Sequence, residues 1–305
     1  MTTKPAARPS IAASTYDLRD APISHALGRI ARLNIQSIEL YGIPDAKALP
    51  HISSLLMEHH LGVACLNAGS QIRVLVHDES LVKHHVSSAI AAARELNSPF
   101  VNVYSGYRTD DSVFDNMFRF KRLMAPLLGE AQESGVGILL ENYYDPASYA
   151  DDARGQHFMR TPDATLMLMD FIGHPALGVI WDPCNHYLAG VEPWPFAYSI
   201  LRPVIRYVHA KSATRYVRGL HGDSPPGAMA IDTITGSYFH VPIDQGAVNW
   251  WGILRQLRAD SFGGTVLLEP HGATQNDFET GIRAGAAFVR DAFEMREETY
   301  LESGR

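Results

Sequence analysis

The chain has 305 residues, a hydrophobic fraction of 46% and a formal net charge of −7 at pH 7. This length and composition suit one large α/β barrel or two smaller globular domains. The negative charge argues against a general nucleic-acid binder, which usually presents a basic surface.

The start of the chain and its cysteines bear on location. Residues 1–8 lack the apolar centre of a signal peptide, so we expect a loosely packed N-terminal tail. No apolar run approaches the ~18 residues of a membrane span, so we expect no membrane partner. Cys65 and Cys184 are too few for a disulfide framework, which predicts a reducing, cytoplasmic setting.

Short apolar runs alternate with longer amphipathic segments along the chain. The short runs predict β-strands at 10–14, 37–42, 62–68, 100–106, 135–142, 178–182, 206–212 and 265–272. The longer segments predict helices, among them 80–97, 161–173, 248–260 and 277–298. In the second of these, Thr161 and Pro162 form a typical helix start.

This alternation predicts the fold. Strand followed by helix, repeated about eight times, is typical of a (β/α)8 TIM barrel. A doubly wound sheet would require a Gly-rich phosphate loop after an early strand, and the sequence has none. We therefore predict an α/β protein with a single TIM-barrel domain over residues 9–298 and a C-terminal tail at 299–305.

One connection, residues 213–241, is too long for an ordinary barrel loop. It follows a predicted strand on the rim that carries the active site in such barrels. We expect it to form either a lid over the barrel mouth or a contact in a homo-oligomer.

Four successive predicted strands end in side chains that bind metal ions: Glu141, Asp182, His209 and Glu269. The C-terminal ends of barrel strands share one rim, and side chains alternate along a strand, so all four can point toward the barrel axis. Each residue alone is more typical of a turn, a helix cap or a buried polar group. Together, three carboxylates would repel one another without a cation, so the set predicts a metal site.

The donor set indicates which metal to expect. Three carboxylates and one imidazole suit a single divalent ion with free coordination positions better than a closed zinc site. We favour Mn²⁺, with Mg²⁺ or Co²⁺ as alternatives and Zn²⁺ as the least suitable.

Further polar residues lie near the same strand ends. Lys211 shares the phase of His209 and can reach the rim, although a lysine lying along the surface is an equal alternative. Asn67 and Tyr104, near the ends of the third and fourth strands, are candidate substrate contacts. Glu39 shares its phase with Tyr41, which allows either a charge inside the barrel or a site residue, and we favour the structural role.

At these residues the chain resembles the xylose isomerase-like TIM barrels, a group of sugar-phosphate isomerases and epimerases. The group includes tagatose and psicose epimerases, hydroxypyruvate isomerase and inosose dehydratase. The resemblance covers roughly residues 8–296 and is carried by the segments "LLEN", "WDPCNHYLAGVEP", "VHAKSA", "VPIDQGAVNWWGILRQL" and "LLEP". It implies that Glu141, Asp182, His209 and Glu269 bind one divalent metal ion. It also implies that the two glutamates act as the acid/base pair.

Two positions near the metal ligands decide how far the resemblance extends. Many members place a histidine three residues after the metal aspartate, where this chain has Asn185, which can hydrogen-bond a substrate hydroxyl but cannot exchange protons. Epimerases of the group often carry an arginine six residues after the metal histidine, and Arg215 fits. This resemblance implies that Arg215 holds a substrate oxygen, whereas a solvated loop arginine is the plain alternative.

The implied activity is isomerisation or epimerisation of a ketose, keto-sugar or related polyol by proton abstraction next to a metal-bound carbonyl. Strands six and seven separate the strands that carry the two glutamates, so the carboxylates can approach a substrate from different sides. A metal-dependent lyase acting on a keto-sugar is the alternative, because elimination shares the first step.

Two further classes fit less well. Apurinic endonucleases share this barrel but take additional histidines where this chain has "LNAG", "NVYSG" and Asn185. A non-catalytic binding protein would be expected to lose a metal ligand, and none is lost.

Overall fold

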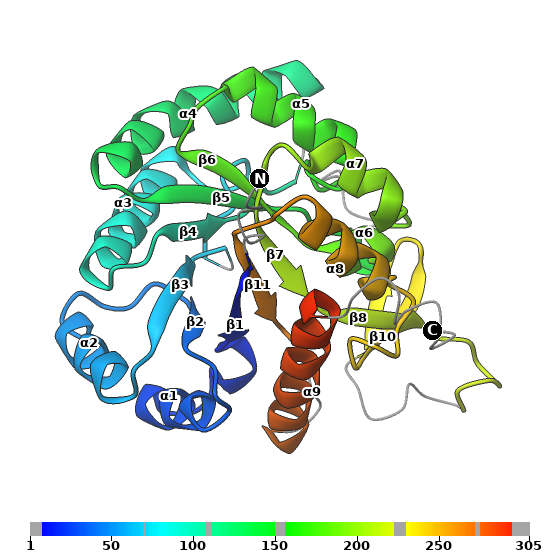
Figure 1. Ribbon diagram of the computed structural model, residues 1–305. Helices are drawn as coiled ribbons and strands as arrows, with labels where there is room; N and C mark the ends of the chain where they lie inside the picture. Colours follow the sequence, from blue (N-terminus) through cyan, green and yellow to red (C-terminus); the bar gives the residue numbers. More distant parts are fainter. Residues whose placement is uncertain are drawn as a thin grey trace, which may run out of the picture.

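The computed structural model describes residues 8–69, 71–107, 111–149, 156–222, 230–271 and 275–294. In it, eight parallel strands close into a barrel surrounded by helices (Figure 1), which confirms the predicted TIM barrel. The strands follow one another around the barrel in the order β1, β11, β7, β6, β5, β4, β3 and β2. The predicted tails, apart from Arg8, lie outside the described residues.

The barrel strands match the predicted runs but are mostly shorter at their C-terminal ends. Their bounds are β1 (Ser10–Ser14), β2 (Ser37–Tyr41), β3 (Gly62–Asn67), β4 (Phe100–Val103), β5 (Gly137–Glu141), β6 (Leu177–Trp181), β7 (Ile205–Ala210) and β11 (Thr265–Leu268). Asp182 and Glu269 therefore lie one residue beyond their strands, where the chain turns away from the barrel.

Helices follow the barrel strands and cover the outside of the barrel. Their bounds are α1 (Ile23–Ala31), α2 (Leu49–Glu58), α3 (Glu79–Glu95), α4 (Val113–Glu133), α5 (Pro162–Ile172), α6 (Pro183–Leu188), α7 (Tyr198–Leu201), α8 (Trp250–Ala259) and α9 (Gln275–Glu294). The predicted start of α5 is confirmed, because Thr161 Oγ1 accepts a hydrogen bond from the Ala164 amide. None of the helices that the structure describes combines the length and apolar character that a membrane crossing requires.

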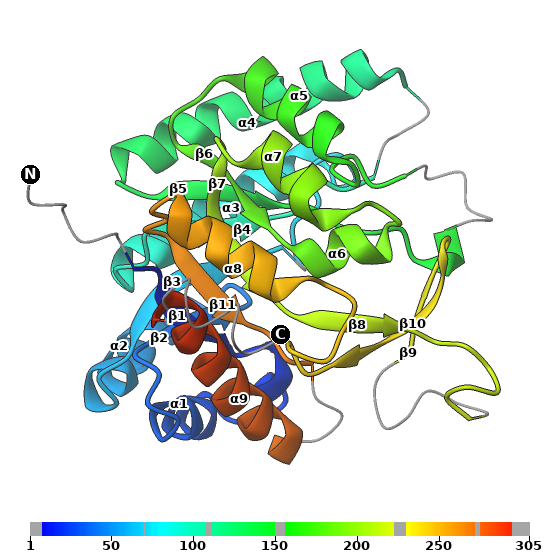
Figure 2. The ribbon, with the colours of Figure 1, turned by 45° about the vertical axis from the view of Figure 1, so that its right-hand side comes forward.

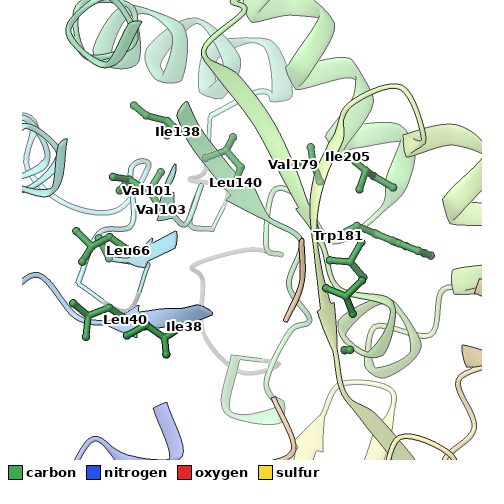
Figure 3. Close-up of a cluster of buried hydrophobic side chains, with 14 of the residues drawn as sticks. Ile38, Leu40, Leu66, Val101, Val103, Ile138, Leu140, Val179, Trp181 and Ile205 are labelled. Carbon is green, nitrogen blue, oxygen red and sulfur yellow. The ribbon is translucent and has the colours of Figure 1, made fainter. Parts of the chain in front are cut away.

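The strands bury their two faces in different layers. Outward-facing side chains pack against the helices and form the larger core; Figure 3 shows part of this layer, including Ile38, Leu40, Ile138, Leu140, Val179 and Trp181. Inward-facing side chains fill the barrel as a separate cluster of Ala12, Ala64, Cys65, Leu139, Ile180, Tyr207 and Leu267. This cluster contains the residue two positions before each predicted metal ligand, so the predicted strand phase is correct for all four strands.

The long connection after β7 contains strands, which the sequence analysis did not predict. We call this region the arm. It comprises β8 (Ser212–Arg215), β9 (Ala230–Thr233) and β10 (Gly236–Val241), which pair as an antiparallel sheet in the order β8, β10, β9. Figure 2 shows this sheet beside the barrel. Residues 223–229 of the same connection lie outside the described residues.

Candidate metal centre and active site

The four predicted metal ligands lie at the C-terminal end of the barrel and are all buried. Glu141 is the last residue of β5, and His209 lies near the end of β7. Asp182 caps the N-terminus of α6, where one of its carboxylate oxygens accepts a hydrogen bond of 2.9 Å from the Asn185 amide. Glu269 directly follows β11. Strand ends and a helix cap thus fix these side chains in place.

Three of the four converge on one point. Glu141, Asp182 and His209 each offer a ligand atom, and these atoms lie within 4.8 Å of one another. Glu269 adjoins them, with its Oε2 atom 3.7 Å from Nδ1 of His209. A cation that binds oxygen and imidazole ligands fits this donor set.

Asp182 has a buried carboxylate oxygen whose hydrogen-bonding capacity is not used by the described residues. Its Oδ2 atom is buried and accepts no hydrogen bond from any residue that the structure describes. Lys211 Nζ lies 2.8 Å from this oxygen, which makes an ion pair without hydrogen-bond geometry. Since a buried carboxylate oxygen normally accepts hydrogen bonds or binds a metal, Asp182 fits the role of a metal ligand.

Protonated bases balance the buried acids in the structure as it stands. Burial disfavours the charged form of His209, but Glu141 and Glu39 outweigh it and raise the pKa of its imidazole well above the usual value. Burial likewise opposes the charge of Lys211, yet Asp182 and Glu269 raise the pKa of its ammonium group. A divalent cation would take over this compensation, provided that His209 gives up its proton.

The carboxyl groups respond differently to the same surroundings. Burial favours the neutral acid at Glu141, but His209 and Lys211 prevail and lower its pKa. At Glu269, Lys211 and His271 overcome the effect of burial and hold the pKa well below its usual range. At Asp182 burial prevails and raises the pKa to about 6. The two glutamates are therefore the acids of this group that are ionised most readily.

Glu39 positions His209, a role that the sequence did not reveal. The Glu39 carboxylate is fully buried, and its Oε2 atom lies 3.1 Å from Nε2 of His209. The other ring nitrogen, Nδ1, faces Glu141 at 3.1 Å. When Glu39 accepts the Nε2 proton, Nδ1 is left as the nitrogen that can bind a metal. Asn67 in turn donates a hydrogen bond of 2.7 Å to Glu39.

Two amides hold Glu141. Asn185 Nδ2 donates to Oε1 of Glu141 at 3.1 Å, and Asn102 Nδ2 donates to Oε2 at 3.2 Å. The Oδ1 atom of Asn185 is buried without a hydrogen-bond partner among the described residues. Asn185 also lines the cavity above the site.

A cavity of about 420 Å³ opens above the acids. Of the predicted substrate contacts, Asn67, Tyr104, Asn185 and Lys211 line it. Trp250 Nε1 donates a hydrogen bond of 2.9 Å to the backbone oxygen of Lys211 and so holds the chain at this residue. Arg215 is exposed on β8 and does not belong to the lining.

The arm forms one wall of this cavity. Ala230, Ile231 and Asp232 of β9 and His240 of β10 contribute to the lining. The arm also meets the loop after β5, where Pro146 forms a β-bridge with Thr233. These described parts of residues 213–241 therefore lie at the barrel mouth, the position expected of a lid.

His271 is a second residue that sequence reasoning missed. Its backbone has the left-handed φ of 48°, and Asp17 accepts hydrogen bonds from its amide at 3.0 Å and its Nδ1 at 3.3 Å. Its Nε2 atom lies 3.5 Å from Oε2 of Glu269. Burial opposes protonation, but Glu269 and Asp17 raise the pKa of His271 to about 9. An imidazolium thus faces the cavity beside Glu269.

Comparison with known proteins agrees with this fold. A family model described as xylose isomerase-like TIM barrel matches residues 27–292. A comparison with curated proteins found no match.

Solved structures with this fold have low sequence identity to the chain. A D-tagatose 3-epimerase-like protein is 18% identical with a TM-score of 0.72, and the match covers 95% of this chain and 99% of that one. The probable 3-DHS dehydratase AsbF from Bacillus anthracis is 17% identical with a TM-score of 0.69, covering 91% and 98%. A protein from Mycobacterium smegmatis, solved in complex with magnesium, is 17% identical with a TM-score of 0.67, covering 94% and 98%.

At these identities the solved structures show a shared fold, whereas the family model rests on the sequence itself. That model spans most of the chain and includes all four of the predicted metal ligands. The chain belongs to the xylose isomerase-like TIM barrel family.

Proposed function

We propose that the protein is a divalent-metal-dependent isomerase or epimerase that moves a proton at the carbon next to the carbonyl of a keto-sugar or keto-polyol. The observation that carries this proposal is the convergence of Glu141, Asp182 and His209 within 4.8 Å, with Glu269 beside them, at the floor of a cavity. Sugar epimerases among the similar folds support it as analogy.

Glu141, Asp182, His209 and Glu269 would hold the metal, and we propose Mn²⁺ as the ion. When bound, such a cation polarises a carbonyl and acidifies the neighbouring C–H bond. The magnesium in the M. smegmatis structure supports a divalent ion of this kind without deciding its identity.

We assign proton transfer to the two glutamates. Both carboxylates are ionised at neutral pH, because neighbouring cations lower their pKa. Glu269 lines the cavity and contacts Lys211 at 2.8 Å, so the lysine can stabilise the carboxylate before it accepts a proton. Glu141 lies on β5, two strands from β7 and three from β11, which suits an approach to the substrate from a different side. A proton removed by one can thus be returned by the other.

A lyase is the second candidate, favoured by His271. An elimination needs a proton donor for the departing hydroxyl, and the His271 imidazolium faces the cavity beside Glu269. The similar fold of a probable dehydratase is consistent with this candidate.

The nuclease and binding-protein alternatives receive less support. At the positions where a nuclease of this fold would carry its extra histidines, the chain has Asn67, Tyr104 and Asn185.

We propose a cytoplasmic enzyme, since Cys65 and Cys184 are both buried free thiols.

Deuterium exchange tests the proposal. Protein loaded with Mn²⁺, Mg²⁺ or Co²⁺ is incubated in D₂O with a panel of ketoses and keto-sugars, and bound metal is quantified in parallel. We expect wash-in at the carbon next to the carbonyl. We also expect it to disappear in Glu269→Gln protein that still holds metal.

The product separates the subclasses. Inverted stereochemistry identifies an epimerase, a moved carbonyl an isomerase, and a lost hydroxyl a lyase. Turnover of a substrate by hydride shift, with no exchange and no eliminated product, would overturn the proton-transfer scheme.

A further inference from the structure

Arg73 lines the catalytic cavity from the side opposite to the metal ligand His209. It follows β3 and forms a parallel β-bridge with Tyr104, and its side chain is half-buried. In the closed barrel, β3 and β7 are four strands apart by either route, through β4, β5 and β6 or through β2, β1 and β11. The metal ligands come from β5, β6, β7 and β11, so Arg73 belongs to the other half of the rim.

Arg73 differs from the cations Lys211 and His271 of this cavity because it forms no ion pair among the described residues. Lys211 lies 2.8 Å from both Asp182 and Glu269, and His271 lies 3.5 Å from Glu269. The Arg73 guanidinium lies over the ring of Tyr107, 5.7 Å from its centroid, and forms no ion pair with any residue in the described part of the chain. No acid among the described residues therefore balances the positive charge of Arg73 through an ion pair.

The two histidines near Arg73, His77 and His157, add no charge of their own near pH 7. The Arg73 amide donates to Nδ1 of His77 at 3.3 Å, and burial followed by Arg73 itself lowers the pKa of His77. Burial is also the main cause that lowers the pKa of His157 to about 3. Both histidines are neutral near pH 7, so the guanidinium is the charge that a ligand would meet on this side.

Aromatic rings line the same cavity as Arg73 and the acids. Tyr143 stacks on Tyr144 at 4.7 Å, and Tyr104 packs against Tyr143 at 5.3 Å. On another side, Tyr16 and Tyr41 meet edge to face at 4.9 Å. A cavity of about 420 Å³ with such walls is in the size range of small-molecule sites. It can hold a sugar-sized molecule with its C–H groups against the rings.

We infer that the substrate is a keto-sugar or keto-polyol with a carboxylate at the end remote from its carbonyl, and that Arg73 binds this carboxylate. The inference rests on the proposed function, which puts the carbonyl at the acids of the other half of the rim. A guanidinium fork matches a planar, singly charged carboxylate by two parallel hydrogen bonds. A phosphate ester, with nearly twice the charge, would require further cations beside Arg73.

A matched series of ligands tests this inference by binding alone. D-Fructose, D-fructuronate and D-fructose 6-phosphate differ only at carbon 6, which is a hydroxymethyl group, a carboxylate or a phosphate ester. Each is titrated calorimetrically into Mn²⁺-loaded protein, together with the corresponding compounds epimeric at carbons 3 and 4. The variants are Arg73→Gln, Arg73→Lys and, as a matched loss of one positive charge elsewhere, Arg94→Gln on the exposed face of α3.

We expect a uronate to bind about 10- to 100-fold more tightly than its neutral counterpart, the range of a charge-assisted hydrogen-bonded pair. Arg73→Gln should abolish this preference and leave the affinity for the neutral ketose nearly unchanged. Arg73→Lys should restore part of the preference for the uronate, and Arg94→Gln should retain the full preference. Retention in Arg94→Gln excludes a general effect of net charge.

Several results would overturn the inference. They are equal binding of acid and neutral sugar, failure of every uronate in the panel to bind, an equal loss for both ligands in Arg73→Gln, or a preference for the phosphate ester. Deuterium exchange shows whether the carboxylate-binding inference fails or the proposed proton-transfer function fails. Arg73-dependent uronate binding without exchange rejects proton transfer alone, whereas exchange into neutral ketoses without acid preference rejects the carboxylate site alone.

Discussion

The C-terminal rim of the barrel has two unlike halves. The ends of β5, β6, β7 and β11 carry Glu141, Asp182, His209, Lys211 and Glu269, which form one network of charges. The ends of β1 to β4 contribute mainly aromatic and amide groups to the cavity, including Tyr41, Asn67 and Tyr104, together with Arg73. We interpret the first half as the site of chemistry and the second as the surface that holds the substrate.

The carboxylate of Glu39 crosses this division. Glu39 lies on β2, but its carboxylate reaches across the barrel interior to His209 on β7. Burial raises the pKa of Glu39, although the contact with His209 opposes the rise. Glu39 therefore contacts the half of the rim that carries the candidate metal ligands, although it lies on a strand of the other half.

The largest expected effect comes from changing a metal ligand. His209→Gln removes the only imidazole of the predicted donor set and leaves Glu141 and Glu39 facing each other without a base between them. We expect metal content after dialysis to fall to background. Tyr104→Phe, a change in the substrate half, should keep its metal. Elemental analysis of both variants checks this, and full metal content in His209→Gln would contradict the account.

Glu39→Gln should have a smaller but clear effect. The change keeps the shape of the side chain and removes the charge that orients His209 for metal binding. Loss of such a supporting partner typically weakens metal affinity by about 10- to 100-fold. Competition with a metal-sensitive dye measures the metal affinity of the variant. An unchanged affinity in a folded variant would show that Glu39 is only a buried structural acid.

Acid should destabilise the fold through two buried histidines that are not among the predicted metal ligands. Burial lowers the pKa of both His157 and His186 to about 3. In the unfolded chain these groups take up protons below about pH 6.5, whereas in the folded chain they remain neutral. The unfolded state thus binds more protons between pH 6.5 and 3, and stability falls as the pH falls through this range.

Denaturant unfolding between pH 7 and 5 measures this loss. The slope should approach roughly 1.4 kcal/mol per pH unit for each histidine. A His157→Gln/His186→Gln double variant should show a shallower slope, even if its stability at pH 7 is lower because Trp181 loses its hydrogen-bond acceptor at His186. The same slope in the variant and the natural chain would contradict the assignment.

The smallest expected effect is a change in the free energy of unfolding, caused by a substitution in the cluster of side chains that fills the barrel below the site. The Tyr207 hydroxyl is buried without a hydrogen-bond partner among the described residues. Tyr207→Phe removes this polar atom and keeps the ring, so it should raise the free energy of unfolding by about 1 kcal/mol. Urea unfolding monitored by circular dichroism checks the sign. A loss of stability would mean that the hydroxyl has a partner, such as a buried water.

Local patterns predicted the barrel and the convergence of the candidate metal ligands at one end of it, because the period of two in each strand reports which face a side chain occupies. Leu139 and Glu141, for example, share a phase in the sequence and share the barrel interior in the structure. The cap at Thr161 was predictable for the same local reason.

Contacts made across the barrel were beyond local patterns. Glu39 and His209 are 170 positions apart, and Asp17 and His271 are 254 apart. That Arg73 forms no ion pair among the described residues also becomes visible only when its neighbours in space are known. The β9–β10 hairpin could have been found, since "GSYFHV" at 236–241 is rich in strand-forming residues and follows a short turn.

The most direct test of the central claim is a crystal structure of the protein with Mn²⁺, with anomalous diffraction used to locate the ion. We predict one principal site, bound by Glu141, Asp182, His209 and Glu269 at about 2.0–2.6 Å. We also predict that Lys211 no longer contacts Asp182. A manganese ion bound elsewhere, or a loaded crystal in which Lys211 still bridges Asp182 and Glu269 and the predicted ligands hold no ion, would contradict the account.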